Sequence, residues 1–158
     1  MTGGGLLLRG ALAGDIEALT AFEALVFVDE PHRISERQWR DLVRRAPGLT
    51  VLALSAADLA GVLVLSSRGR TLRILSLGVH PRFRRQGVGR VLLQQAEAAA
   101  RSIGLVRIRL EVRADNLGAI ALYEAHGYRI EGRLPSYYGE GEDGVRMERV
   151  IAVVGDAD

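Results

Sequence analysis

The segment that most constrains the fold lies in the middle of the chain, where a β-rich run passes through a glycine turn into a helical pattern. Residues 72–79 are mostly apolar and are bounded by turn-forming residues, which is typical of a strand. Gly87 and Gly89 occupy the turn, and residues 88–103 carry apolar side chains at helical spacing up to Gly104, a helix stop. A strand that leads directly into a long helix predicts an α/β protein. We expect the helix to bury Val91 or Leu92, Gln95 or Ala96, and Ala99.

The remaining elements follow from the same two periodicities. Ser35 and Gln38 form a capping-box pattern that opens a second helix, and Pro31 is expected to end the first. The order β-α-α-β-β-β-α-β-α-β-β predicts one α/β domain over residues 1–158, with helices on the faces of a mixed sheet and frayed ends at 1–5 and 155–158. The expected strands are 6–12, 50–55, 61–67, 72–79, 106–113, 128–133 and 145–153, and the expected helices are 15–27, 35–45, 88–103 and 115–126.

Residues 106–113 alternate cleanly between apolar and charged side chains. Because successive side chains of a strand point to opposite faces, one face of this strand is expected to pack under a helix while the other is charged. Glu111 belongs to the charged face, among the arginines of its own strand at positions 107, 109 and 113. An ion-paired surface glutamate is one interpretation, and a carboxylate that relays a proton is the other.

Composition excludes several classes of function. The chain has no cysteine, which excludes disulfides, thiolate metal sites and a cysteine nucleophile, and no His/Asp/Glu spacing suggests a metal site. No apolar run reaches the ~18 residues that a membrane-spanning helix requires. Arginines are dispersed between acids and form no basic tract. We therefore expect a cytoplasmic protein that binds neither membranes nor nucleic acid.

The glycine turn has the chemistry of an anion-binding loop. Backbone N–H groups in the first turn of a helix have no intrahelical partner, the helix dipole adds positive charge, and glycine allows a phosphate to approach. A P-loop is excluded because the chain has no lysine, and a dinucleotide-binding motif fails because Leu92 stands where glycine or alanine is needed. An ordinary glycine turn remains the alternative. The predicted pyrophosphate cradle consists of Arg85, Gln86, Gly87, Val88, Gly89 and Arg90.

One family combines these features. Residues 84–89, Arg-Arg-Gln-Gly-Val-Gly, match the R/Q-x-x-G-x-G/A motif of the GNAT family of acetyl-CoA-dependent N-acetyltransferases. Leu-Glu-Val-Arg-Ala-Asp-Asn at 110–116, followed by Ala-Ile-Ala-Leu-Tyr-Glu at 119–124 and by Gly127 and Tyr128, resembles the bacterial ribosomal-protein alanine N-acetyltransferases within it. The resemblance covers nearly the whole chain. It implies acetyl-CoA as donor cosubstrate and the GNAT fold, a mixed, mostly antiparallel, twisted sheet of about seven strands flanked by about four helices.

The resemblance also implies where acetyl-CoA binds. In the family, the main chain of the strand before the cradle binds the pantetheine and the thioester. Gly78 on that strand departs from the alanine common there, and we expect it to ease a β-bulge. Asn116, the sole asparagine, matches a residue that contacts the coenzyme, although a helix N-cap is a compatible role. The implied binding residues are Leu77, Gly78, Val79, Arg84, Arg85, Gln86, Gly87, Val88, Gly89, Arg90, Asn116 and Tyr123.

Catalytic and acceptor-binding roles follow in the same way. The resemblance implies that Glu111 is the general base and that Tyr123 protonates the departing thiolate, with a core tyrosine as the alternative for Tyr123. The loop after residue 134 resembles the acceptor-binding loop of N-terminal acetyltransferases, in which Tyr137 and Tyr138 line the acceptor groove. Its acids at 140, 142 and 143 attract cations in one interpretation and face solvent in the other.

We therefore expect an acyltransferase that passes acetyl directly from acetyl-CoA to a primary amine, in particular the N-terminal α-amine of a protein or peptide. A monomer and a homodimer are both compatible with the sequence. Two alternative functions stay open: a small-molecule amine acetyltransferase for a polyamine, an antibiotic or an amino acid, and a non-catalytic acyl-CoA-binding module. Residues 29–38 do not match the ribosomal-protein enzymes, and that region shapes acceptor choice in the family.

Overall fold

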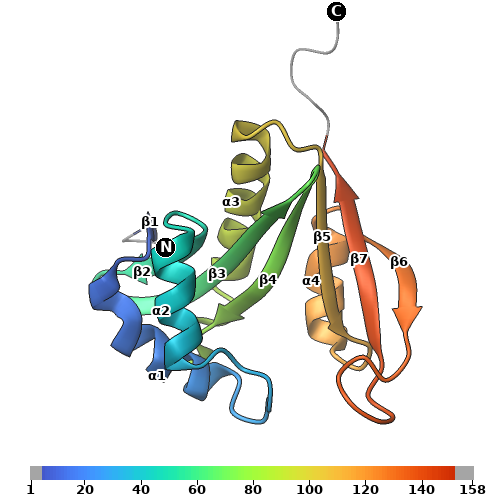
Figure 1. The fold of residues 1–158 in the computed structure, drawn as a ribbon, viewed down its shortest axis with the longest axis horizontal. Coiled ribbons are helices and arrows are strands. Elements are labelled where there is room, and N and C mark those ends of the chain that lie inside the picture. Colours follow the sequence, from blue (N-terminus) through green and yellow to red (C-terminus); the bar gives the residue numbers. More distant parts are fainter. Residues whose placement is uncertain (1–4, 152–158) are drawn as a thin grey trace, which may run out of the picture. The chain divides into compact units, whose positions relative to one another are not determined.

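The computed structural model describes residues 5–151, and its elements follow the predicted order (Figure 1). The ends expected to fray, 1–5 and 155–158, lie outside the described residues except for Gly5, which is exposed. The strands are β1 (Leu7–Gly10), β2 (Thr50–Ser55), β3 (Asp58–Arg68), β4 (Thr71–Val79), β5 (Arg107–Arg113), β6 (Arg129–Leu134) and β7 (Gly144–Val150). The helices are α1 (Ile16–Val26), α2 (Glu36–Arg45), α3 (Val88–Ser102) and α4 (Leu117–Ala125), with short 3-10 turns η1 (Ala13–Asp15) and η2 (Pro81–Phe83).

The strands form a seven-stranded sheet in the order β1-β2-β3-β4-β5-β7-β6. The pairs β1/β2, β2/β3, β5/β7 and β6/β7 are antiparallel. The pair β4/β5 is parallel, and its register joins Thr71–Ile74 to Arg107–Leu110. The expected fold class, a mixed and mostly antiparallel sheet with α-helices, is therefore confirmed.

The chain divides into two compact units, which are described one at a time. Unit 1 comprises Met1–Val64 and Ser76–Leu92, and unit 2 comprises Leu65–Leu75 and Leu93–Asp158. The prediction of a single domain over 1–158 stays a prediction. In unit 1 the first two helices pack on the first strands through a core of Ala11, Leu19, Phe22, Trp39, Val43, Leu52, Val62 and Val64.

The helices of unit 1 begin and end for local reasons. The capping box predicted for α2 is present: the Ser35 hydroxyl accepts from the Gln38 backbone N–H at 3.2 Å, and the Gln38 side chain accepts from the Ser35 N–H at 2.8 Å. Helix α1 ends at Val26, one residue before the expected end at residue 27 and ahead of Pro31. Its last bond runs from the Phe27 N–H to the Glu23 carbonyl at 2.9 Å.

The buried stripe of α3 differs in part from the predicted one. Leu92 and Ala96 are fully buried, as expected, but the stripe continues to Ala100, whereas Ala99 is half-buried. Val88 and Leu93 are buried as well, so each buried position of α3 has another three or four residues along the helix. This spacing keeps them on one face of the helix.

Unit 2 is built around β5 and β7. The predicted alternation of β5 is confirmed, because Ile108, Leu110 and Val112 are buried. In the antiparallel register, Leu110 lies opposite Met147 and Val112 opposite Val145, so the two strands share one apolar face. Arg149 shares the Met147 face of β7 and donates to Glu97 of α3 at 2.8 Å. The apolar face is therefore the side on which α3 lies, and the charged side chains of β5 point to the other side.

Candidate functional site

The turn before α3 presents unpaired backbone amides. The first bond that closes a full turn runs from the Val91 N–H to the Gly87 carbonyl at 3.0 Å, so the amides of the three preceding residues, 88–90, have no partner within the helix. Arg85 has φ +64° and Gly87 has φ +81°, both in the left-handed region. Successive residues of changing handedness turn their N–H groups toward one concave side, which makes an anion-binding nest. Val88 is buried and anchors the helix start.

The side chains of the predicted cradle do not all point outward. The Arg84 guanidinium donates to the Val79 carbonyl at 3.4 Å, and the Gln86 amide donates to the Arg82 carbonyl at 3.1 Å. These two side chains hold the turn in shape. Arg85 and Arg90 are exposed, so their charges are available to an anion beside the nest.

The end of β4, predicted to bind the thioester, is packed too tightly for a side chain at its central residue. A Cβ on Gly78 would lie 3.1 Å from the Phe27 ring and 3.2 Å from the Phe22 ring. Leu77 and Val79 are half-buried on either side. The structure thus supplies a packing reason for glycine at position 78 that the sequence did not reveal, and the expected β-bulge is not needed to explain it.

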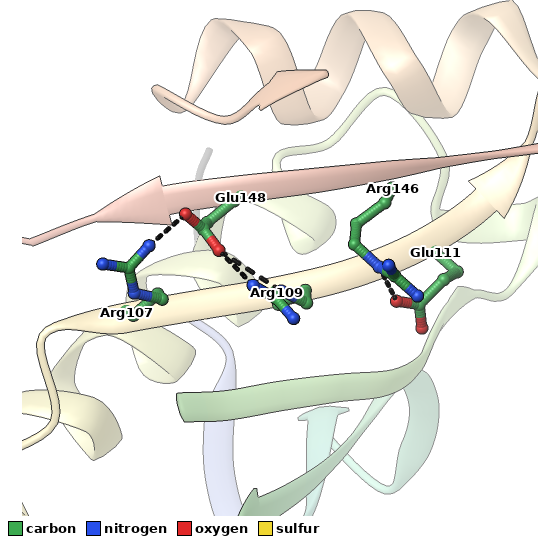
Figure 2. A network of polar contacts seen from close by, with 5 residues as sticks. All are labelled: Arg107, Arg109, Glu111, Arg146 and Glu148. Atoms are coloured by element: carbon green, nitrogen blue, oxygen red, sulfur yellow. Dashed lines mark hydrogen bonds and ion pairs between the residues drawn. The ribbon is translucent and has the colours of Figure 1, made fainter. Parts of the chain in front are cut away.

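Glu111 is held by two arginines from neighbouring strands. Arg73 of β4 donates to Oε1. The Nε of Arg146 on β7 donates to Oε2 at 3.0 Å, and Figure 2 shows this second contact. The Glu111 side chain is only 8% exposed. Glu111 shares its face of β5 with the arginines of that strand, as the alternation predicts. Its ion-pair partners come from the neighbouring strands instead, while Arg107 and Arg109 pair with Glu148 of β7.

Sequence reasoning missed Glu148, the second buried carboxylate on this face. Figure 2 shows it between Arg107 and Arg109, and its side chain is 8% exposed. Burial raises the pKa of this carboxyl, but the hydrogen bonds from Arg109 and Arg107 outweigh burial and leave the pKa below its ordinary value. Its position could not be read from spacing, because it depends on the register that sets Glu148 opposite Arg109.

Helix α4 carries Asn116 and Tyr123. The Asn116 side chain accepts from the Ala119 N–H at 3.1 Å, so the N-cap role is present. Tyr123 is buried, which raises its pKa to about 12, and its ring centroid lies 5.8 Å from that of Tyr128. The Tyr128 hydroxyl is buried and has no hydrogen-bond partner among the residues described.

The loop between β6 and β7 is held to β5 through its tyrosines and acids. Tyr137 and Tyr138 pack edge to face with ring centroids 4.9 Å apart, and the Arg113 guanidinium lies 4.7 Å from the centroid of Tyr138. Arg113 also pairs with Glu142 at 2.7 Å. Arg113 is two residues from Glu111 on the same face of β5, so Tyr138 is brought to the charged face that carries Glu111.

Asp143 holds the loop between β6 and β7 through its carboxylate and its backbone carbonyl. Its carboxylate accepts from the Ser136 N–H at 2.9 Å and from the Arg133 guanidinium at 2.9 Å, and these contacts lower its pKa. Its carbonyl accepts from the Ala114 N–H at 2.9 Å. The acids at 142 and 143 therefore have structural partners, while Glu140 is exposed.

The predicted site residues fall into the two units as follows. Unit 1 contains residues 77–79 and 84–90, whereas unit 2 contains Glu111, Asn116, Tyr123, Tyr137 and Tyr138. Within residues 5–151 there is no group of His, Asp and Glu side chains placed to hold a metal ion. In the same range, no helix has the length and apolar character needed to cross a membrane.

A mixed seven-stranded sheet with a nest at the N-terminus of α3 is the arrangement that the resemblance to acetyl-CoA-dependent acetyltransferases predicts. The family model described as the acetyltransferase (GNAT) family matches residues 16–128. The chain belongs to the GNAT family of acetyltransferases.

Two curated relatives and one solved structure show which members of the family the chain resembles. The ribosomal protein bS18-alanine N-acetyltransferase of Salmonella typhimurium is 40% identical over 65 residues, covering 41% of this chain and 44% of that protein. The N-alpha-acetyltransferase RimI of Mycobacterium tuberculosis is 37% identical over 102 residues, covering 61% and 63%. The crystal structure of Ard1 from Thermoplasma volcanium has a TM-score of 0.84 at 31% identity, covering 93% of this chain and 98% of that one. The match thus spans less than half the length of the Salmonella enzyme.

Proposed function

We propose that the chain transfers an acetyl group directly from acetyl-CoA to the N-terminal α-amine of a protein or peptide, and that it does so in the cytoplasm. One observation carries the proposal: the left-handed residues Arg85 and Gly87 turn the amides at the start of α3 into an anion-binding nest immediately after the strand that ends at Val79. Membership of the GNAT family supports acetyl-CoA as the anionic ligand. The names of the relatives support an N-terminal α-amine as the acceptor.

The cradle binds the donor by charge and by backbone donors. The amides of residues 88–90 and the exposed guanidinium groups of Arg85 and Arg90 are matched to a pyrophosphate, which offers several acceptor oxygens and negative charge. The strand residues 77–79 offer main-chain groups to the pantetheine arm. Acetyl-CoA supplies the activated thioester, and no covalent enzyme intermediate is needed.

Glu111 assists the loss of a proton from the amine. The nitrogen forms a bond to the thioester carbonyl carbon, the carbon–sulfur bond breaks, and the ammonium proton must leave. An α-amine has a pKa of about 8 whereas a lysine side chain has one near 10.4, so more of the α-amine is neutral at pH 7 and ready to attack. A carboxylate that accepts the remaining proton through water then suffices.

Tyr123 assists the departing sulfur. Burial raises the pKa of Tyr123 to about 12, so its hydroxyl is protonated at neutral pH. A thiol has a pKa of about 8.5, so complete proton transfer from this tyrosine to the thiolate is uphill. We therefore assign Tyr123 a hydrogen bond to the sulfur as charge develops on it, with the proton that finally neutralises the thiolate coming from solvent.

The experiment is a measurement of coenzyme A release with a thiol reagent, which this cysteine-free chain does not consume. The acceptors are peptides with a free N-terminus, the same peptides blocked at the N-terminus but carrying a lysine, and a panel of small amines. We expect turnover on free N-termini alone. Glu111→Gln should lower kcat by about 10²- to 10⁴-fold, the usual contribution of acid–base catalysis.

Two other outcomes would change the proposed acceptor or the proposed activity. Turnover on small amines alone would retain the chemistry but refute the protein acceptor. Acetyl-CoA binding without turnover on any acceptor would favour a non-catalytic acyl-CoA-binding module.

A further inference from the structure

Both oxygens of Glu111 are held by arginines that come from other strands. Arg146 lies directly opposite Glu111 in the β5/β7 register, and its Nε donates to Oε2 at 3.0 Å. Arg73 pairs with Arg109 in the β4/β5 register, two residues along from Glu111, and its Nη2 donates to Oε1. Each guanidinium is therefore anchored by a strand that is itself hydrogen-bonded to β5.

This arrangement restricts a side chain that is otherwise flexible. A glutamate has three rotatable side-chain bonds, and ordering it costs rotamer freedom. Here the cost is met when the sheet forms, because the cross-strand pair and the diagonal pair fix one oxygen each. The carboxylate is thus oriented before any acceptor arrives, which is the condition for efficient catalysis by a positioned group.

The two arginines leave the Glu111 carboxylate able to accept further hydrogen bonds. A carboxylate has about four acceptor positions, and the two arginines occupy one on each oxygen.

We propose that Arg73 and Arg146 are positioning residues for acetyl transfer, which act on the acceptor amine only through Glu111. The inference rests on the proposed function, in which Glu111 takes part in deprotonating the amine. It assigns a role to two side chains that neither the motifs nor the spacing of the sequence singled out.

The same sheet face contains a matched control. Glu148 is buried to the same extent as Glu111 and is also held by two arginines, Arg107 and Arg109, but it has no part in the proposed reaction. The side chains of Arg146 and Arg109 are both 38% exposed, and both bond a buried glutamate across the same strand pair. Arg109→Gln therefore removes a contact of the same kind as Arg146→Gln.

The experiment compares kcat, KM for both substrates and Tm for five variants: Arg146→Gln, Arg146→Lys, Arg73→Gln, Arg109→Gln and Glu111→Gln. We expect Arg146→Gln and Arg73→Gln to lower kcat by about 10- to 100-fold, as a misplaced catalytic group does, with KM for acetyl-CoA unchanged. Arg146→Lys should recover part of kcat, because an ammonium keeps the charge and can donate to Oε2. Arg109→Gln should lower Tm by as much as Arg146→Gln does and leave kcat at the wild-type value.

Three results would overturn the proposal. Wild-type kcat in Arg146→Gln together with a large loss in Glu111→Gln refutes the positioning role but retains the catalytic role of Glu111. Equal losses of kcat in Arg109→Gln and Arg146→Gln show that the effect is structural. Wild-type kcat in Glu111→Gln would show that Glu111 is not the base, and the positioning role of the two arginines would be refuted with it.

Discussion

Gly61 of β3 and Val88, the first residue of α3, are so close that a side chain on the glycine cannot be accommodated. A Cβ on Gly61 would lie 2.6 Å from the Val88 Cγ1 and 2.9 Å from the Leu92 Cδ1. The β3 backbone at Gly61 is thus the surface against which the N-terminus of α3 packs. The proposed cradle is made by that N-terminus. We therefore expect acetyl-CoA binding to depend on this contact within unit 1.

Gly61→Ala should therefore destabilise the protein and weaken acetyl-CoA binding together. Overpacking of a tight contact costs about 1–3 kcal/mol in unfolding free energy, and relief of the clash requires the side chains of Val88 and Leu92 at the start of α3 to shift. Gly132→Ala on β6 is the matched control, since a Cβ there meets nothing within 4 Å. Denaturant unfolding and calorimetric titration with acetyl-CoA measure the two effects. A stable Gly61→Ala protein with normal affinity would contradict the packing argument.

Arg85→Gln separates charge from backbone shape in the cradle. Arginine and glutamine bear a similar strain at φ +64°, so the unfolding free energy should change by less than about 0.5 kcal/mol. Acetyl-CoA affinity should fall, and the fall should shrink as salt is added, because an exposed charge is screened. Arg37→Gln, an exposed arginine on α2, should leave affinity unchanged. Equal affinity of Arg85→Gln and wild type at low salt would show that the charge of Arg85 does not contribute to phosphate binding.

Glu148→Gln should make the protein less stable at neutral pH and remove a pH dependence. The pKa of Glu148 lies below its ordinary value of 4.5 in the folded state, so its ion pairs stabilise the fold above that value. This stabilisation is lost as the pH falls through the folded-state pKa. We expect a loss of about 1.5–3 kcal/mol at pH 7, the range for hydrogen bonds to charged groups. Denaturant unfolding from pH 7 to pH 3 measures it; a difference between wild type and variant that persists undiminished at pH 3 would refute the assignment.

Tyr128→Phe should stabilise the protein, whereas Tyr123→Phe should lower its activity. The Tyr128 hydroxyl is buried without a partner among the described residues, so its removal should raise the unfolding free energy by about 1 kcal/mol. Tyr123→Phe should lower kcat by roughly 10-fold or more, because the sulfur loses its hydrogen-bond donor. Thermal unfolding and coenzyme A release on both variants test the pair. A loss of activity in Tyr128→Phe that matches Tyr123→Phe would show that the two hydroxyls act together.

Local patterns predicted most of the fold. The capping box at Ser35 and Gln38, the alternation of residues 106–113 and the glycine turn before α3 each depend on neighbours a few residues apart, and the structure contains all three. The one difference in the buried face of a helix is also local in scale. The buried stripe of α3 reaches Ala100 instead of Ala99, because packing partners decide which of two adjacent positions is covered.

The partners of the functional residues required the tertiary structure. From the sequence alone, the charged face of β5 was recognisable and Glu111 could be singled out on it. Its partners Arg73 and Arg146 lie 38 and 35 residues away, and strand register, which is set by the pairing of whole faces, brings them together. The same holds for Gly61 against Val88, where only the packed helix reveals why the strand needs glycine. Periodicity is a property of short segments, and it determined the elements and their order, whereas contacts between distant segments exist only once those elements have packed.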